Sequence, residues 1–458
     1  MLQTFSTTWQ DPSLPYLDIV TDSRAMAYRF AQNLRMTLLQ QKWQVENCAL
    51  ERLQYHWSKC HHCRLLYRVN LRDASGQKFD QWFWGELWSN DRVQRKFEEA
   101  QHSPFLQNGI WQPVQLWPEL NMIIWSFPND PEMPGLLKAT DLAFVQSQVN
   151  ANLAAWGLRG DWRCVPHTLK RVKYMPGKRC VLRYHLRLVD SRGQSRDLSF
   201  YSKTYHDSAS TFHYQVLQKV YDHLHNRINI PRPLVYLKEA CTFWQEPWEG
   251  RPLVEMLDNL EWNELFPRLA TVLATFHQSQ CQDLPEAGNW DEVLDSAQED
   301  TLKLGWFFPQ YRSRLNAALA ALLAAKANLT KQEVPVVPIH GAIRLEQLVA
   351  RHDEVALVDF DAAGLGDPLY DVAEFLASLQ YMEFSYGFPH RFARAAELFM
   401  ASYQQQVPWV VNPQRMAWYT VAFLLSKMLG SLKHLDRGVL QRFEAVLEII
   451  ESRLKFLR

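Results

Sequence analysis

The 458-residue sequence lacks an excess of either charge, a long apolar run and a paired set of cysteines. Lys plus Arg is 49 and Asp plus Glu is 49, which gives no electrostatic support for binding nucleic acid or a membrane surface. The longest apolar run, Ala317 to Ala325, is far short of the about 20 residues that cross a bilayer. The N-terminus shows no signal-peptide pattern, and seven scattered cysteines are typical of reduced thiols. We therefore expect a cytoplasmic protein.

What the sequence does contain is material for a large core. Hydrophobic residues make up 47% of the chain, and the length suggests two or three domains. The 18 tryptophans are many, and we expect most of them in the core, with some available to stack on a sugar or a base.

Two segments, 21–138 and 140–257, resemble one another. Each opens with Thr-Asp, continues through two strands around a turn, and reaches a second turn, DASGQ in one copy and DSRGQ in the other. We interpret them as a duplicated small α+β domain, although short strands can also match by chance.

The pattern changes to helices from about residue 258. The predicted domains are 1–139, a cap; 140–254, a β-rich lobe; and 255–458, a helical lobe. The predicted helices are Glu261–Gln280, Tyr311–Ala327, Pro368–Tyr381, Pro389–Gln405, Pro413–His434 and Arg437–Leu457.

The segment ALVDFDAAGLGDPLYDVA has features of a metal site. An apolar strand ends at Asp359, and Asp361 lies on the same side of an extended chain. Carboxylates are the ligands that Mg²⁺ prefers, and they often share the ion with substrate phosphates. A β-turn with solvated acids is the alternative interpretation.

Upstream stands IHGAIRLEQLV, residues 339–349. The order His-Gly, a Gln six residues after the Gly, a hairpin, Asp-Phe-Asp and Gly-Asp-Pro-x-x-Asp resembles the aminoglycoside phosphotransferase superfamily, which includes choline kinases and maltokinases. The resemblance implies a two-lobed protein-kinase-like α+β fold, here with a duplicated N-lobe-like domain at the N-terminus. It also implies that the protein binds ATP and Mg²⁺ between its lobes and phosphorylates a small hydroxylated acceptor. Gln347 is similar to the maltokinase pattern, which favours a sugar.

Carried over to the helical lobe, the resemblance makes His340 the organiser of the loop. Gln347 and Asp359 would be Mg²⁺ ligands with Asp361 beside them, and Asp371 would brace the segment.

In the β-rich lobe, Lys203 would contact the ATP phosphates. The turn with Gly177 and Lys178 would cover the phosphates. The segment Gln245, Glu246 and Pro247 would be the hinge whose backbone bonds adenine.

The sequence departs from the family's pattern at the catalytic aspartate. The third loop residue is Ala342 where the family has an Asp, and loss of a general base costs about 10²–10⁴ in rate. Glu346 and Asp361 are the nearby acids that could replace it. Gln215 stands where the lysine's glutamate partner is expected. The alternative function is therefore a catalytically inactive pseudokinase that serves, with a protein partner, as a nucleotide-dependent regulatory or scaffolding protein.

The first copy departs further. Glu86 occupies the position of Lys203, so this copy is predicted to be a cap rather than a second nucleotide site. Its Cys60-His61-His62-Cys63 segment admits a zinc interpretation, but a plain hairpin turn is favoured because one tight turn rarely places four ligands tetrahedrally.

Overall fold

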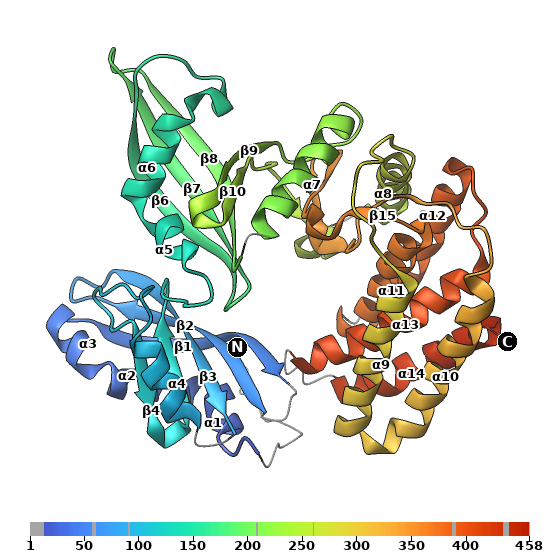
Figure 1. Ribbon diagram of the computed structural model, residues 1–458, viewed down its shortest axis with the longest axis horizontal. Helices are drawn as coiled ribbons and strands as arrows, with labels where there is room; N and C mark the ends of the chain where they lie inside the picture. Colours follow the sequence, from blue (N-terminus) through green and yellow to red (C-terminus); the bar gives the residue numbers. More distant parts are fainter. Residues whose placement is uncertain are drawn as a thin grey trace. The chain divides into compact units, whose positions relative to one another are not determined.

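The computed structural model describes residues 13–56, 61–89, 92–207, 209–259, 261–386, 391–433 and 439–457 (Figure 1). They form two compact units. One comprises 13–211 and 234–245, and the other comprises 212–233, 246–432 and 439–457. Helix α7 (Ala209–Leu224) begins in the first unit and continues in the second. Among these described residues, no helix combines the length and apolarity that crossing a bilayer requires.

The first unit contains two five-stranded sheets with the same strand order, β1-β2-β3-β5-β4 and β6-β7-β8-β10-β9. The strands of the first sheet are β1 (Gln44–His56), β2 (His62–Arg72), β3 (Lys78–Trp88), β4 (Val114–Trp117) and β5 (Met122–Ser126). Those of the second are β6 (Trp162–Met175), β7 (Arg179–Asp190), β8 (Ser195–Tyr205), β9 (Pro233–Leu237) and β10 (Thr242–Gln245). The repeat in the sequence thus corresponds to a repeat of topology.

The two copies also share their local devices. Asp22 caps α2 (Ser23–Asn33) and Asp141 caps α6 (Leu142–Ala151), each by accepting a backbone N–H of the first helical turn. At the second turn of each copy, Asp73 and Asp190 each accept two backbone N–H groups, two and four residues further on. The remaining helices of this unit are α1 (Leu17–Thr21), α3 (Arg35–Gln41), α4 (Arg92–Gln101) and α5 (Gly135–Thr140).

One hydrophobic core extends across both copies. It includes Trp84 and Trp125 of the first sheet together with Tyr184 of the second. Trp82 on β3 stacks on Tyr174 on β6 with ring centroids 6.1 Å apart. The chain therefore does not separate into compact units at residue 139, and the domain limits predicted above stay predictions.

The second unit is mainly helical. Its helices are α8 (Trp262–His277), α9 (Trp290–Phe307), α10 (Arg312–Leu329), α11 (Pro368–Tyr386), α12 (Arg391–Gln406), α13 (Pro413–Lys433) and α14 (Val439–Leu454). Six of these match the predicted helices within a few residues, but α9 was not predicted. Buried polar residues, Asp300 and Thr301, interrupt its apolar stripe. The Asn289 side chain, which caps α9, was the signal available in the sequence.

Candidate functional site

The loop that follows β12 (Val337–Ile339) is held by one buried carboxylate. Asp371, at the start of α11, accepts the backbone N–H groups of His340 at 2.6 Å and Gly341 at 2.8 Å. Its Oδ2 also lies 3.1 Å from Nε2 of His277, whose Nδ1 meets the Tyr403 hydroxyl at 2.7 Å. Asp371 therefore has the bracing role predicted for it.

Two residues of this loop converge on the backbone of Val358. Nε2 of His340 donates to the Val358 carbonyl at 3.0 Å, and the Val358 N–H donates to the Gln347 carbonyl at 3.0 Å. Val358 follows the hairpin of β13 (Leu348–Arg351) and β14 (Glu354–Leu357) and directly precedes Asp359. The contacts thus bring the backbone of Gln347 next to that of Asp359, and their role as ligands of one ion stays a prediction.

The donors present suit a magnesium ion. Asp359 adopts left-handed backbone angles (φ 71°), which few non-glycine residues do and which Asp tolerates better than most. The Gln347 side chain is 5% exposed, and its Oε1 has no hydrogen-bond partner among the described residues. A buried acceptor of this kind calls for a partner, and carboxylate and amide oxygens are ligands that Mg²⁺ accepts. Asp361 lies half-buried on the 3₁₀ turn Phe360–Ala362 that follows.

Ala342 provides no acid or base in this loop. The preceding Gly341 has φ 74°, and a Cβ there would lie 2.1 Å from the backbone oxygen of Ala362. Of the two predicted replacements, Glu346 is exposed and Asp361 is half-buried. Their role as a replacement for the missing acid stays a prediction.

A cavity of about 270 Å³ opens beside this loop, among α9, α11 and α13. Gly288 on its wall lies against Ile339 and Tyr370, the residues that precede His340 and Asp371. Its lining includes three carboxyl groups, two aromatic rings and two serine hydroxyls, from Glu292, Asp300, Glu374, Tyr370, Phe423, Ser296 and Ser426. Sequence reading identified none of these residues, because the helices that supply them are far apart in the chain.

One of these carboxyl groups, that of Glu374, has a shifted pKa. Burial raises its pKa to about 7, although the charges of Lys427 and Arg344 favour the ionised form. Burial also lowers the pKa of Lys427. A carboxyl group with a pKa near neutrality can exchange a proton with a bound molecule.

In the first unit, strand register supports the predicted correspondence of Lys203 and Glu86. Lys203 on β8 pairs with Phe243, the second residue of β10, and Glu86 on β3 pairs with Ile123, the second residue of β5. Lys203 is 8% exposed, and its Nζ lies 5.9 Å from the centre of the Phe243 ring.

Glu86 is engaged in an ion pair within its own sheet. Its Oε1 accepts Nε of Arg64 at 2.9 Å, and Arg64 also pairs with Glu132. Burial raises the pKa of Glu86, against the effect of Arg64. A buried carboxylate with a committed cation does not suit a phosphate, and the cap role of this copy stays a prediction.

The turn predicted to cover the phosphates is fastened to the first copy. Gly177 donates its N–H to Oδ2 of Asp130 at 2.8 Å, and the Tyr174 hydroxyl donates to the same oxygen at 2.8 Å. Asp130 is 1% exposed. The N–H of Gly177 is thus occupied by a protein carboxylate, and the covering role of the turn stays a prediction. Lys178, on the same turn, is exposed.

Part of the predicted hinge also makes contacts within the protein. The Glu246 N–H donates to the Arg232 carbonyl at 2.8 Å, and the Glu246 carboxylate pairs with the Arg232 guanidinium. Gln245 is buried at the end of β10, and Pro247 is half-buried. Gln215, on α7, is exposed.

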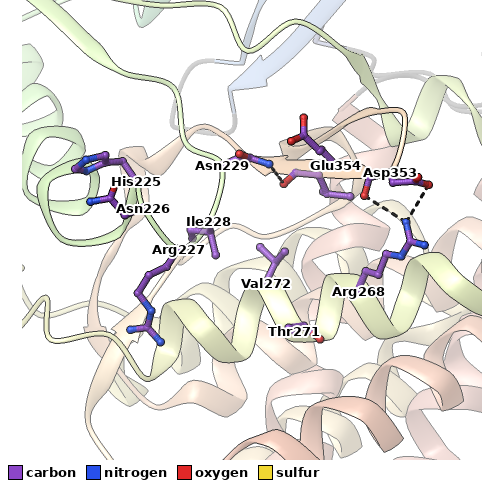
Figure 2. Close-up of a pocket in the computed structure, with 11 residues that line it drawn as sticks. His225, Asn226, Arg227, Ile228, Asn229, Arg268, Thr271, Val272, Asp353 and Glu354 are labelled. Atoms are coloured by element: carbon purple, nitrogen blue, oxygen red, sulfur yellow. Dashed lines mark hydrogen bonds and ion pairs between the residues drawn. The ribbon is translucent and has the colours of Figure 1, made fainter.

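A second hollow, of about 390 Å³, lies where the segment after α7 meets the β13–β14 turn (Figure 2). Figure 2 shows Arg268 reaching from α8 to Asp353 at that turn, with Nη1 3.2 Å from Oδ1. The Leu357 N–H donates to the Asn229 carbonyl at 3.0 Å. These contacts anchor the hairpin that leads to Asp359.

The Cys-His-His-Cys segment joins β1 to β2, which pair as an antiparallel hairpin. Cys60 lies outside the described residues. Cys63 is buried on β2, and the His62 ring stacks between those of His56 and Trp88, with centroids 4.4 and 4.6 Å away. The hairpin interpretation thus agrees with the strands, and the zinc interpretation stays untested.

Residues 186–418, more than half of the chain, match the family model described as "Phosphotransferase enzyme family". Similar solved structures include a choline/ethanolamine kinase family protein from Mesorhizobium loti (15% identity, 64% of this chain and 92% of that one, TM-score 0.44). Another is a choline kinase from Cryptosporidium parvum (11% identity, 69% of this chain and 96% of that one, TM-score 0.47). A third is an aminoglycoside phosphotransferase from Streptomyces rimosus (16% identity, 61% of this chain and 98% of that one, TM-score 0.38). No curated protein matches the chain.

Proposed function

Because this chain belongs to the phosphotransferase enzyme family, with its kinase-like α+β fold, we propose that it binds Mg-ATP and transfers the phosphoryl group slowly or not at all. One observation carries the first half of this proposal. The buried Oε1 of Gln347 has no hydrogen-bond partner among the described residues. The backbone carbonyl of Gln347 accepts the N–H of Val358, the residue before Asp359. A Mg²⁺ ion held there would neutralise phosphate charge. Lys203 is the proposed phosphate contact in the other unit.

The second half of the proposal rests on Ala342. A methyl group can neither accept the proton of an acceptor hydroxyl nor orient that hydroxyl. Phosphoryl transfer depends mostly on positioning and electrostatics, so loss of the base slows transfer without preventing nucleotide binding. This is the chemistry of a pseudokinase, which would act through a protein partner according to its bound nucleotide.

Thermal denaturation with and without Mg-ATP tests the proposal. Ligand at about 100 times Kd adds about 2.7 kcal/mol to the stability of the folded state. We expect Mg-ATP to raise the melting temperature, ATP with a chelator to raise it less, and Asp359→Asn to abolish the difference. If millimolar Mg-ATP leaves the melting temperature unchanged, the proposal is wrong.

The cavity beside the loop favours a second candidate, slow transfer to a small acceptor. Carboxylates accept hydrogen bonds from hydroxyl or ammonium groups, and aromatic rings can stack on a sugar face. A sugar or an amino sugar therefore fits this lining better than an anionic or an apolar molecule.

Release of ADP in the presence of a panel of neutral sugars, amino sugars and amino alcohols tests the second candidate. We expect Ala342→Asp to raise turnover about 10²–10⁴-fold with the productive acceptor. If the wild type and Ala342→Asp are both inactive although Mg-ATP binds, the pseudokinase alternative is favoured.

A further inference from the structure

Three potential metal ligands meet where α7 approaches the segment that follows α8. They are His223, on the last turn of α7, and Cys281 and Asp283, which stand two residues apart after α8. One ligand atom from each residue lies within 4.8 Å of the other two. Cys281 is fully buried, whereas His223 and Asp283 are exposed, so an ion could enter from solvent and reach the thiol.

One ring nitrogen of His223 is held by the backbone of its own helix. The Nδ1 of His223 lies 2.8 Å from the Lys219 carbonyl, which can only accept, so Nδ1 carries the proton. Nε2 is then left with its lone pair. Metal-ligating histidines commonly donate their other ring N–H to a backbone carbonyl in this way.

The ammonium group of Lys219 competes with a metal ion for the carboxylate of Asp283. The Nζ of Lys219 lies 3.2 Å from Oδ2 of Asp283. Burial raises the pKa of the Cys281 thiol to about 11, which Asp283 reinforces and Lys219 opposes. Because the thiolate is the ligand, metal binding must release the thiol proton and will strengthen as pH rises.

We propose that His223, Cys281 and Asp283 bind a zinc ion. Zn²⁺ accepts sulfur, imidazole nitrogen and carboxylate oxygen, and three protein ligands leave a fourth position for water. The ion would link the last turn of α7 to the segment after α8. These ligands are softer than Asp359 and Gln347, so zinc and magnesium would not compete for one place.

Titration of the full-length protein with Co²⁺ and Zn²⁺ tests this proposal. After treatment with a chelator, we expect about one Co²⁺ per chain to give a thiolate-to-cobalt charge-transfer band, which Zn²⁺ then removes. Cys281→Ser should abolish the band, and His223→Ala should weaken Zn²⁺ binding at least tenfold, measured by competition with a chromophoric chelator. Lys219→Met should strengthen binding.

His225 provides the matched control. Its Nδ1 makes the same contact with the backbone carbonyl four residues earlier, that of Tyr221, at 2.7 Å, but it is not part of the cluster. We expect His225→Ala to bind zinc as the wild type does. Both exposed histidine variants should keep the metal-free melting temperature, which separates ligand loss from misfolding. The proposal is overturned if the wild type gives no cobalt band or if His225→Ala weakens binding as much as His223→Ala.

Discussion

Asp130→Ala is the substitution expected to disturb the first unit most clearly. The carboxylate is 1% exposed and accepts the Tyr174 hydroxyl, the Gly177 N–H and, at 3.0 Å, the Glu132 N–H. Removing it leaves two buried donors of the second copy without their acceptor, at about 1–3 kcal/mol each.

Part of this cost is offset by a gain. Burial raises the pKa of Asp130, so its charged form is itself disfavoured in the folded state. We therefore expect Asp130→Ala to lower the free energy of unfolding by about 2–4 kcal/mol. Asp130→Asn, which keeps one acceptor oxygen, should lose less than half of that.

Urea denaturation followed by tryptophan fluorescence measures the loss, because Trp82 stacks on Tyr174 in the same core. Hydrogen exchange localises it, since the Gly177 amide should exchange faster in the variant. Asp197→Ala is the control, because Asp197 is 75% exposed and its pair with Arg187 is worth little. Wild-type stability for Asp130→Ala, or unchanged exchange at residues 174–179, would refute this reasoning.

Three further predictions concern the helical unit. The pKa of Glu374 is raised from 4.5 to about 7, so the folded state holds this proton more tightly than the unfolded chain does. The resulting stabilisation of the folded state is present below pH 4.5 and is lost as the pH rises toward 7. Glu374→Gln should therefore remove about 3 kcal/mol of pH dependence from denaturant melts between those values, and an unchanged pH profile would contradict the assignment. Gly341→Ala should destabilise the protein by more than about 2 kcal/mol, because backbone strain at φ 74° adds to the close contact with Ala362. The control is Gly76→Ala, which has φ 89° but lies in open space and therefore carries only the backbone strain. Equal losses of stability in thermal melts would exclude a cost from the Ala362 contact. Asp371→Ala should cost about 3–5 kcal/mol, since it removes a buried carboxylate from two backbone donors and His277, and a loss below 1 kcal/mol in urea melts would show that the loop holds itself.

Residues close together in the sequence were the ones that could be predicted. His340, Gln347 and Asp359 lie within one short stretch, and a strand end with tight turns restricts how such a stretch folds. The strand register likewise supports the correspondence of Glu86 and Lys203, because each lies at a fixed distance from recognisable turns.

Contacts between distant segments could not be read in this way. Gly177 was assigned from its turn alone, but its partner Asp130 belongs to the other copy and carries no local signal. The cavity takes its lining from α9, α11 and α13, and α9 itself was missed because polar side chains dilute its apolar stripe. The cluster of His223 with Cys281 depends on how α7 packs, which spacing along the chain does not determine.

The aromatic core that spans the two sheets makes the two copies one folding unit. A gene shortened to begin at residue 140 would encode a second sheet whose Tyr174 has lost Trp82, the ring of the first sheet that stacks on it. Glu86 and Lys203 show that equivalent places in the two sheets can carry opposite charge.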